Sequence, residues 1–165
     1  GHQTGRTLEL SMRATTALFG HAGIEWDITE TTPNERELLK SWASYYKSKR
    51  SLLHSSTMVR VDYPDDHGLL HGVTSKNKTE AIFAYVQITP TVAVNPAPLK
   101  FPGLESDATY EIKAVFPAGE PRYMSVKKPD WMSGITLSGS ALSAIGVSAP
   151  ILAPANAFLI EITKR

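Results

Sequence analysis

The pattern of apolar and polar residues divides the chain into a helical first third and a β-rich remainder. Apolar residues between positions 8 and 19 recur at the spacing of a short helix. We expect this helix to end at Gly20, because glycine readily takes the left-handed conformation beyond a helix. Ile24, Trp26 and Ile28 then alternate with acidic residues, which predicts a brief extended stretch.

A second, longer helix is predicted most clearly. Thr32 is a suitable N-cap, Pro33 suits the first helical position, and Glu35 follows the cap by three residues, so the segment carries a capping box. Apolar residues then recur every three or four positions and form one stripe, made of Leu38, Trp42, Tyr45, Tyr46, Leu52 and Leu53. The opposite face is basic. The pattern predicts an amphipathic helix that lies on a large apolar surface.

After residue 55 the pattern becomes that of β-structure. Strand-like runs, separated by polar turns and by loops with proline and glycine, occupy residues 58–63, 68–74, 79–89, 99–101, 109–116, 134–137 and 157–163. About seven short strands at close spacing favour an antiparallel sandwich or barrel. We therefore predict an α+β chain: two N-terminal helices over residues 1–55, then a Greek-key-like antiparallel all-β sandwich over residues 56–165.

Composition narrows the class of protein. The chain has 42% hydrophobic and 20% charged residues, as soluble globular proteins do, and its net charge of +1 does not form the basic surface of a nucleic-acid binder. No apolar run reaches the roughly 18 residues of a membrane span, and no signal peptide is recognisable. The absence of cysteine suits a reducing compartment, so we expect a cytoplasmic location and neither nucleic acid nor membrane as a partner.

No motif in the chain requires catalysis or a bound ion. Asp65 and Asp66 are adjacent acids, but Pro-Asp-Asp between two strands is typical of a turn. The five histidines show no metal-binding spacing, so we predict no catalytic residue, no metal and no cofactor. Trp131 follows Pro129 and Asp130 in a loop and is the one aromatic residue that we retain as a candidate for stacking on a sugar.

Several motifs occur in the chain in a fixed order. They are His2-Gln3-Thr4-Gly5-Arg6-Thr7, Phe-Gly-x-x-Gly-x-Glu-x-Asp at 19–27, Tyr46-Lys47 with Arg50-Ser51-Leu52-Leu53-His54, Phe101-Pro102-Gly103-Leu104, and Ile-Thr-Leu-Ser-Gly-Ser-Ala-Leu at 135–142. Together they resemble the C-terminal part of the retaining α-galactosidases of glycoside hydrolase family thirty-six, also called melibiases. The similarity runs over nearly the whole chain.

The resemblance implies a fragment of a larger enzyme. A (β/α)8 barrel needs about 250 residues, so residues 1–55 would be its last helical part and residues 56–165 the C-terminal sandwich. The chain starts at Gly1 without methionine, which also led us to expect a piece of a longer protein. The two catalytic aspartates of the family lie upstream of the matched motifs, so no residue here is expected to catalyse.

The same resemblance implies roles and partners. His2, Gln3, Thr4 and Arg6 would lie in a loop at the active-site face of the barrel and shape the rim of a galactose pocket. The partners would be the remainder of the α-galactosidase chain and, through it, melibiose- or raffinose-type α-galactosides hydrolysed with retention. The alternatives are an independent carbohydrate-binding sandwich and a structural cap that also packs copies into a homo-oligomer. In a fragment, the apolar stripe of the second helix must be covered by the β domain or by another copy.

Overall fold

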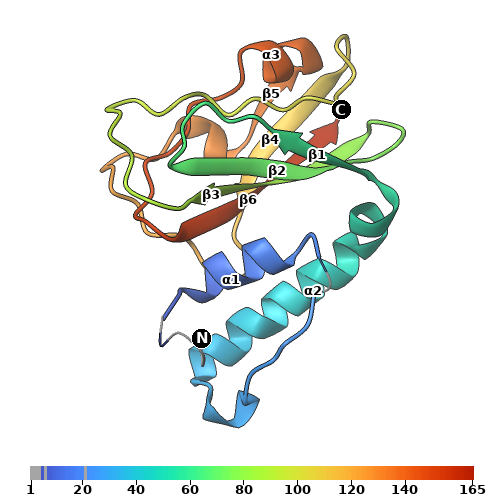
Figure 1. Cartoon of the computed structure of the whole chain (residues 1–165). Coiled ribbons are helices and arrows are strands. Elements are labelled where there is room, and N and C mark those ends of the chain that lie inside the picture. The colour runs from blue at the N-terminus through green and yellow to red at the C-terminus, as the bar shows by residue number, and fades with distance from the viewer. Residues whose placement is uncertain (1–4, 6, 21) are drawn as a thin grey trace.

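The computed structural model describes residue 5, residues 7–20 and residues 22–165. Figure 1 shows three layers: two helices below, a sheet in the middle and a layer of loops with a short helix above. The elements are α1 (Leu10–Ala17), η1 (Ile28–Glu30), α2 (Pro33–Ser55), β1 (Thr57–Val61), β2 (Gly68–Thr74), β3 (Glu80–Gln87), β4 (Thr109–Val115), η2 (Asp130–Ser133), β5 (Ile135–Ser138), α3 (Gly139–Ala144) and β6 (Asn156–Lys164). The predicted α+β chain, with helices followed by an antiparallel β domain, is confirmed.

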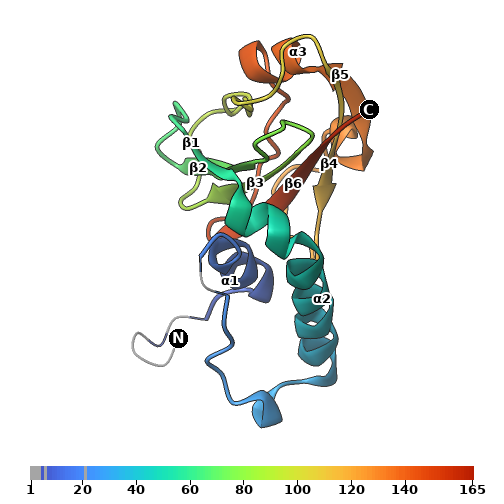
Figure 2. The same cartoon turned by 90° about the vertical axis from the view of Figure 1, so that its right-hand side faces the viewer.

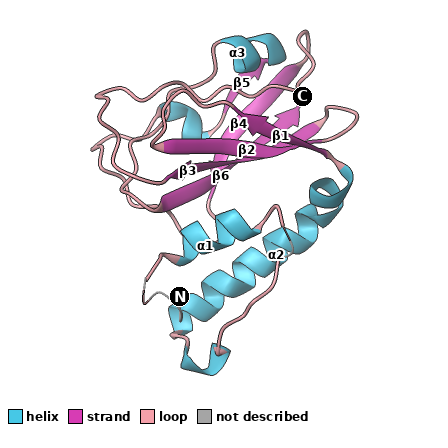
Figure 3. Ribbon diagram, in the orientation of Figure 1, coloured by secondary structure: helices cyan, strands magenta, loops and turns pink. Residues whose placement is uncertain are grey.

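Strands within the described residues form one antiparallel sheet in the order β1-β2-β3-β6-β4-β5 (Figure 3). The last strand of the chain is inserted between β3 and β4. A Greek key would place the fourth strand beside the first of three consecutive strands, so the Greek-key order we expected is wrong. Both faces of the sheet centre are covered, which explains why β3 and β6 are almost continuously apolar rather than alternating.

The layer opposite the helices is made of loops rather than of a second sheet. Residues 99–101, predicted as a strand, form only an isolated bridge in which Leu99 and Val147 exchange two backbone hydrogen bonds. Pro98 and Pro102 flank this segment and lack the N–H groups that would extend the ladder. The loop layer nevertheless buries Phe101, which meets the edge of Phe83 with 5.1 Å between ring centroids. The β domain is therefore a sheet closed by packed loops.

The capping box of α2 is present as predicted. The Glu35 amide donates to Thr32 Oγ1 at 3.2 Å, and the Thr32 amide donates to Glu35 Oε2 at 2.8 Å. Pro33 occupies the first turn, and α2 ends at Ser55. These contacts satisfy amide groups that a helix start leaves without partners.

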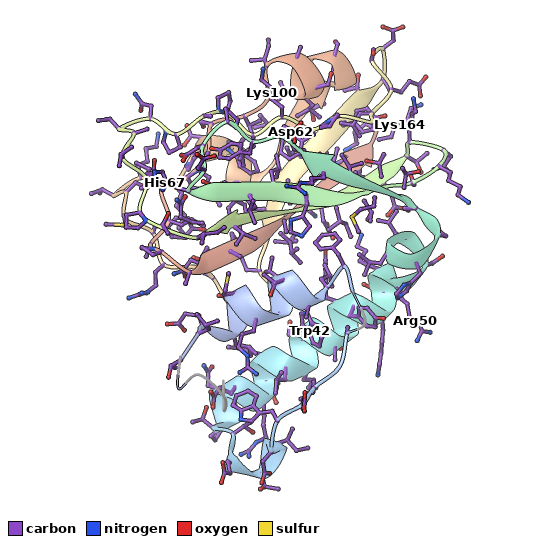
Figure 4. All side chains as sticks on the ribbon, in the orientation of Figure 1. Trp42, Arg50, Asp62, His67, Lys100 and Lys164 are labelled. Carbon is purple, nitrogen blue, oxygen red and sulfur yellow. The ribbon has the colours of Figure 1, made fainter. Side chains whose placement is uncertain are left out.

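The apolar stripe of α2 is covered within the chain. Leu53 joins Val73 and Ile82 in the core between the helices and the sheet, and Trp42 packs with Ala14 of α1 and with Ala118. Figure 4 shows Trp42 between the two helices, and its side chain is only 5% exposed. We expected either the β domain or another copy of the chain to cover the stripe. In the structure, residues of the same chain cover it.

Candidate functional site

A pocket is lined by the described residues that follow the predicted substrate rim along the sequence. His2, Gln3, Thr4 and Arg6 lie outside the described residues, and Thr7 is the first of the described residues that line the pocket. The pocket has a volume of about 330 Å³ and lies where the N-terminal ends of α1 and α2 meet two loops of the β domain. Its lining consists of residues 7–11 and Asn34, Glu35 and Leu38 on one side, and residues 118–120, 122 and 154–156 on the other.

A buried asparagine holds the two β-domain loops of this pocket together. Asn156 is 1% exposed; its Oδ1 accepts from the Arg122 amide at 2.9 Å, and its Nδ2 donates to the Pro154 carbonyl at 3.0 Å. Ala155 beside it has a φ of 54°, a conformation that costs a non-glycine residue energy. These residues were not predicted, because an asparagine at the start of a strand gives no sequence signal of the loop it will bind.

Glu35, one of the acids that line the pocket, is suited to holding structure rather than to proton transfer. Hydrogen bonds from the Thr32 backbone and then from its hydroxyl lower the pKa of Glu35. A general acid that works near neutral pH needs a raised carboxyl pKa instead. Among the described carboxyl groups, those with a perturbed pKa are Asp27, Glu35 and Glu105, and each is lowered by hydrogen bonds, from Thr29, Thr32 and Lys164 respectively.

Other candidates from the sequence are also placed. Asp65 Oδ1 accepts from the His67 amide at 2.9 Å and its Oδ2 accepts from Thr91 at 3.2 Å, so this acid organises the turn between β1 and β2.

No cluster of three or more histidine or acidic side chains suited to a metal ion occurs in the part of the chain that the structure describes. Within that part, no helix is long and apolar enough to cross a membrane.

Trp131 lies in the core of the β domain. It is 4% exposed, its Nε1 donates to the Ser148 carbonyl at 2.8 Å, and its ring lies 6.3 Å from that of Phe158. Stacking on a sugar requires an open aromatic face, so this position favours a packing role. The sequence placed Trp131 in a loop but contained no signal that the loop, which forms η2, folds inward.

Comparisons with known proteins identify the class of protein that this fold belongs to. Residues 71–162 match the model described as glycosyl hydrolase family 36 C-terminal domain, and residues 1–56 match the model described as Melibiase. Thus the chain is built from parts of a glycoside hydrolase. It belongs to glycosyl hydrolase family 36, as the resemblance of its motifs implied.

Relatives of known identity are α-galactosidases much longer than this chain. The α-galactosidase of Escherichia coli is 32% identical over 99% of this chain, which spans 24% of that relative. Alpha-galactosidase AgaA of Geobacillus stearothermophilus is 30% identical over 78% of this chain and 18% of its own length. The crystal structure of the Lactobacillus brevis α-galactosidase superimposes with a TM-score of 0.79 at 26% identity, covering the whole of this chain and 21% of that chain.

Proposed function

We propose that this chain is the C-terminal part of a retaining α-galactosidase and that it is itself non-catalytic. The observation that carries the proposal is the pair of family matches, Melibiase over 1–56 and the family 36 C-terminal domain over 71–162. The segments they cover share one core, in which Leu18 and Leu53 from the helices pack with Val73 and Leu159 from the sheet. A domain fused in this way acts as a fixed part of the enzyme.

The proposed substrates are oligosaccharides with terminal α-D-galactosyl residues, such as melibiose and raffinose. One neighbour of this fold, a variant of AgaA from G. stearothermophilus with a TM-score of 0.78, has been crystallised in complex with raffinose. Hydrolysis with retention uses two carboxyl groups about 5–5.5 Å apart, one as nucleophile and one as acid and base. We propose that both come from the remainder of the enzyme. The carboxyl groups of the described residues whose pKa is shifted all have a lowered pKa, and they serve helix caps and an ion pair.

We also propose that His2, Gln3, Thr4 and Arg6 form part of the rim of the substrate pocket. Barrel enzymes build their active sites at the C-terminal ends of the barrel strands, the ends from which the following helices start. Thr7 lines a pocket at the starts of both α1 and α2, and this position supports the rim assignment. The rim would bind and orient sugar hydroxyl groups, whereas proton transfer would remain with the barrel acids.

The test compares two proteins with a chromogenic α-galactoside. The full-length enzyme that contains this chain should release the chromophore, and NMR of the product should first show α-galactose. The 165-residue chain alone should release none. A full-length enzyme without activity, or an isolated chain that turns over at an enzymatic rate, would overturn the proposal.

The location and the assembly of the enzyme stay predictions. We propose a cytoplasmic enzyme, in keeping with a chain free of cysteine, and cell fractionation tests this. Packing of copies into a homo-oligomer is tested by sedimentation of the full-length enzyme.

A further inference from the structure

A polar pocket lies where the C-terminal end of α2 meets the hairpin between β2 and β3. Figure 1 shows these two segments at the same end of the molecule, and Figure 2 views the molecule from that side. The pocket has a volume of about 640 Å³, and Leu52 is the one apolar residue among the described residues that line it. Six lining residues carry a hydroxyl group: Ser48, Ser51, Ser55, Ser56, Ser75 and Thr79. This composition suits a polar ligand.

Hydrogen bonds within the hairpin occupy the acceptor atoms of two lining side chains. Ser75 Oγ accepts from the amides of Thr79 and Glu80, both at 3.0 Å, and these bonds use the two acceptor sites of a hydroxyl oxygen. Asn77 Oδ1 accepts from the Thr79 hydroxyl at 2.8 Å. Ser75 therefore retains an O–H group and Asn77 retains an NH2 group, and both of these groups are donors.

The helix side of the pocket contains a further polar group without a partner. Ser56 follows α2 as its C-cap, and its Oγ is buried and makes no hydrogen bond with the described residues. A buried polar atom in this state costs free energy that a bound group would recover. In contrast, the Ser48 and Ser55 hydroxyls donate to the carbonyls of Tyr45 and Ser51 within the helix.

The charges of the lining favour an anion. Lys76 forms no ion pair with an acid of the described residues. Lys49, the other lysine of the lining, lies 3.9 Å from Glu80 and 3.2 Å from Glu161. The two lysines and Glu80 give the described lining a formal charge of +1, which exceeds the roughly half negative charge of a helix C-terminus.

Exposed basic residues around the pocket strengthen this positive potential. Each of them is next to a lining residue along the chain, and charges within the Debye length of about 10 Å act on a ligand in the pocket. They are Lys47, Arg50 and Lys78. A neutral polyol would gain nothing from these charges, whereas an anion is attracted by all of them.

We infer that the pocket between α2 and the β2–β3 hairpin binds a phosphate group. The Lys76 ammonium group supplies the charge, and the Asn77 amide and the hydroxyls of Ser75 and Ser56 donate to the phosphate oxygens. Donors on both sides of the pocket require more acceptor oxygens than the two of a carboxylate, and a phosphate has at least three. Inorganic phosphate and a phosphate monoester share this chemistry. The inference does not depend on the proposed function, because no contact in it involves an α-galactoside.

Calorimetry of the full-length protein, at constant ionic strength, tests the site with inorganic phosphate and with glycerol 3-phosphate. We expect saturable binding of one phosphate per chain with a Kd of about 1 mM or lower. Tighter binding of glycerol 3-phosphate would identify the ligand as a phosphate monoester, and equal or weaker binding would identify it as free phosphate. Heat that does not saturate with either probe would overturn the inference.

Two substitutions in the hairpin test which groups hold the phosphate. Lys76→Met removes the charge, and Asn77→Asp keeps the oxygen that accepts from Thr79 but replaces the donor group with a carboxylate oxygen. Each should raise the Kd at least about 10-fold, because charged hydrogen bonds to phosphate are strong. Lys127→Met is the matched control, since Lys127 is 80% exposed and pairs with Asp130 outside this pocket. Unchanged binding in both hairpin variants, or an equal loss in the control, would overturn the inference.

Discussion

Lys49 Nζ on α2 lies 3.2 Å from Glu161 Oε1 on β6, and this ion pair joins the long helix to the centre of the sheet. Lys113 of β4 approaches the other oxygen of Glu161 at 3.7 Å. The Glu161 side chain is 13% exposed, so water screens this pair less than it screens pairs on the surface. The contact helps to fix the helical part on the β domain.

Lys49→Met should therefore destabilise the chain, with a loss of about 1–2 kcal/mol in the free energy of unfolding measured by urea denaturation. Lys40→Met is the matched control, because Lys40 pairs with Glu37 at 3.7 Å where both side chains are 75% exposed. The control should change stability by less than about 0.5 kcal/mol. Equal effects would mean that Lys49 acts through its aliphatic stem only.

Gly72→Ala should disrupt the pairing of β2 with β3. A Cβ at this position would lie 2.2 Å from the Ile82 carbonyl oxygen and 2.7 Å from Phe83 Cα, so backbone would have to move. We expect a loss of about 3 kcal/mol, seen as a fall in thermal stability. Gly20→Ala, whose Cβ would meet only the Ala17 oxygen at 3.9 Å, should be tolerated. A stable Gly72→Ala variant would contradict the observed register.

The cap of α2 should make stability depend on acid pH. The folded pKa of Glu35 lies below its ordinary value of 4.5, because Thr32 donates to its carboxylate. The ionised form therefore stabilises the fold above that value, and this contribution is lost as the pH falls through the folded pKa. Glu35→Gln should lower the melting temperature at pH 7, and its difference from wild type should shrink toward pH 3. In a Thr32→Ala background the difference should already be small at pH 7.

Trp131 tests the carbohydrate-binding alternative. Trp131→Ala should cost about 3–5 kcal/mol as a large-to-small change in the core. Trp131→Phe should remain folded and lose only the hydrogen bond to the Ser148 carbonyl. We expect a flat titration of the wild-type chain with millimolar galactose. Saturable binding that Trp131→Phe weakens would instead support a sugar-binding role.

Arg6 tests the substrate rim. In the full-length enzyme, Arg6→Ala should lower kcat/KM for an α-galactoside by roughly 10- to 100-fold, which corresponds to about 1.4–2.7 kcal/mol of transition-state stabilisation. Arg36→Ala is the control, since Arg36 Nη1 donates to the Thr31 carbonyl at 3.0 Å near the start of α2. Unchanged kinetics in a folded Arg6→Ala variant would assign the loop a structural role.

The sequence by itself determined the features that depend on neighbouring residues. The capping box of α2 is a contact between Thr32 and Glu35, three residues apart, so its pattern was sufficient to place the helix start. Most strands were recognisable because their apolar runs end at turn residues. The ordered motifs identified the family, since they retain the residues that its members share.

Only the tertiary structure decided how these elements combine. β6 pairs with β3 and β4, strands at least 40 positions earlier along the chain, and no local pattern specifies such distant pairing. The same limit applies to Trp131, which lies in a loop that folds onto the core. Ile24 and Ile28 show the opposite case, because their alternation predicts an extended stretch, whereas Ile28 begins η1 and the two side chains are 48% and 57% exposed. A hydrophobic pattern indicates which side chains must be buried, whereas the long-range packing decides which residues cover them.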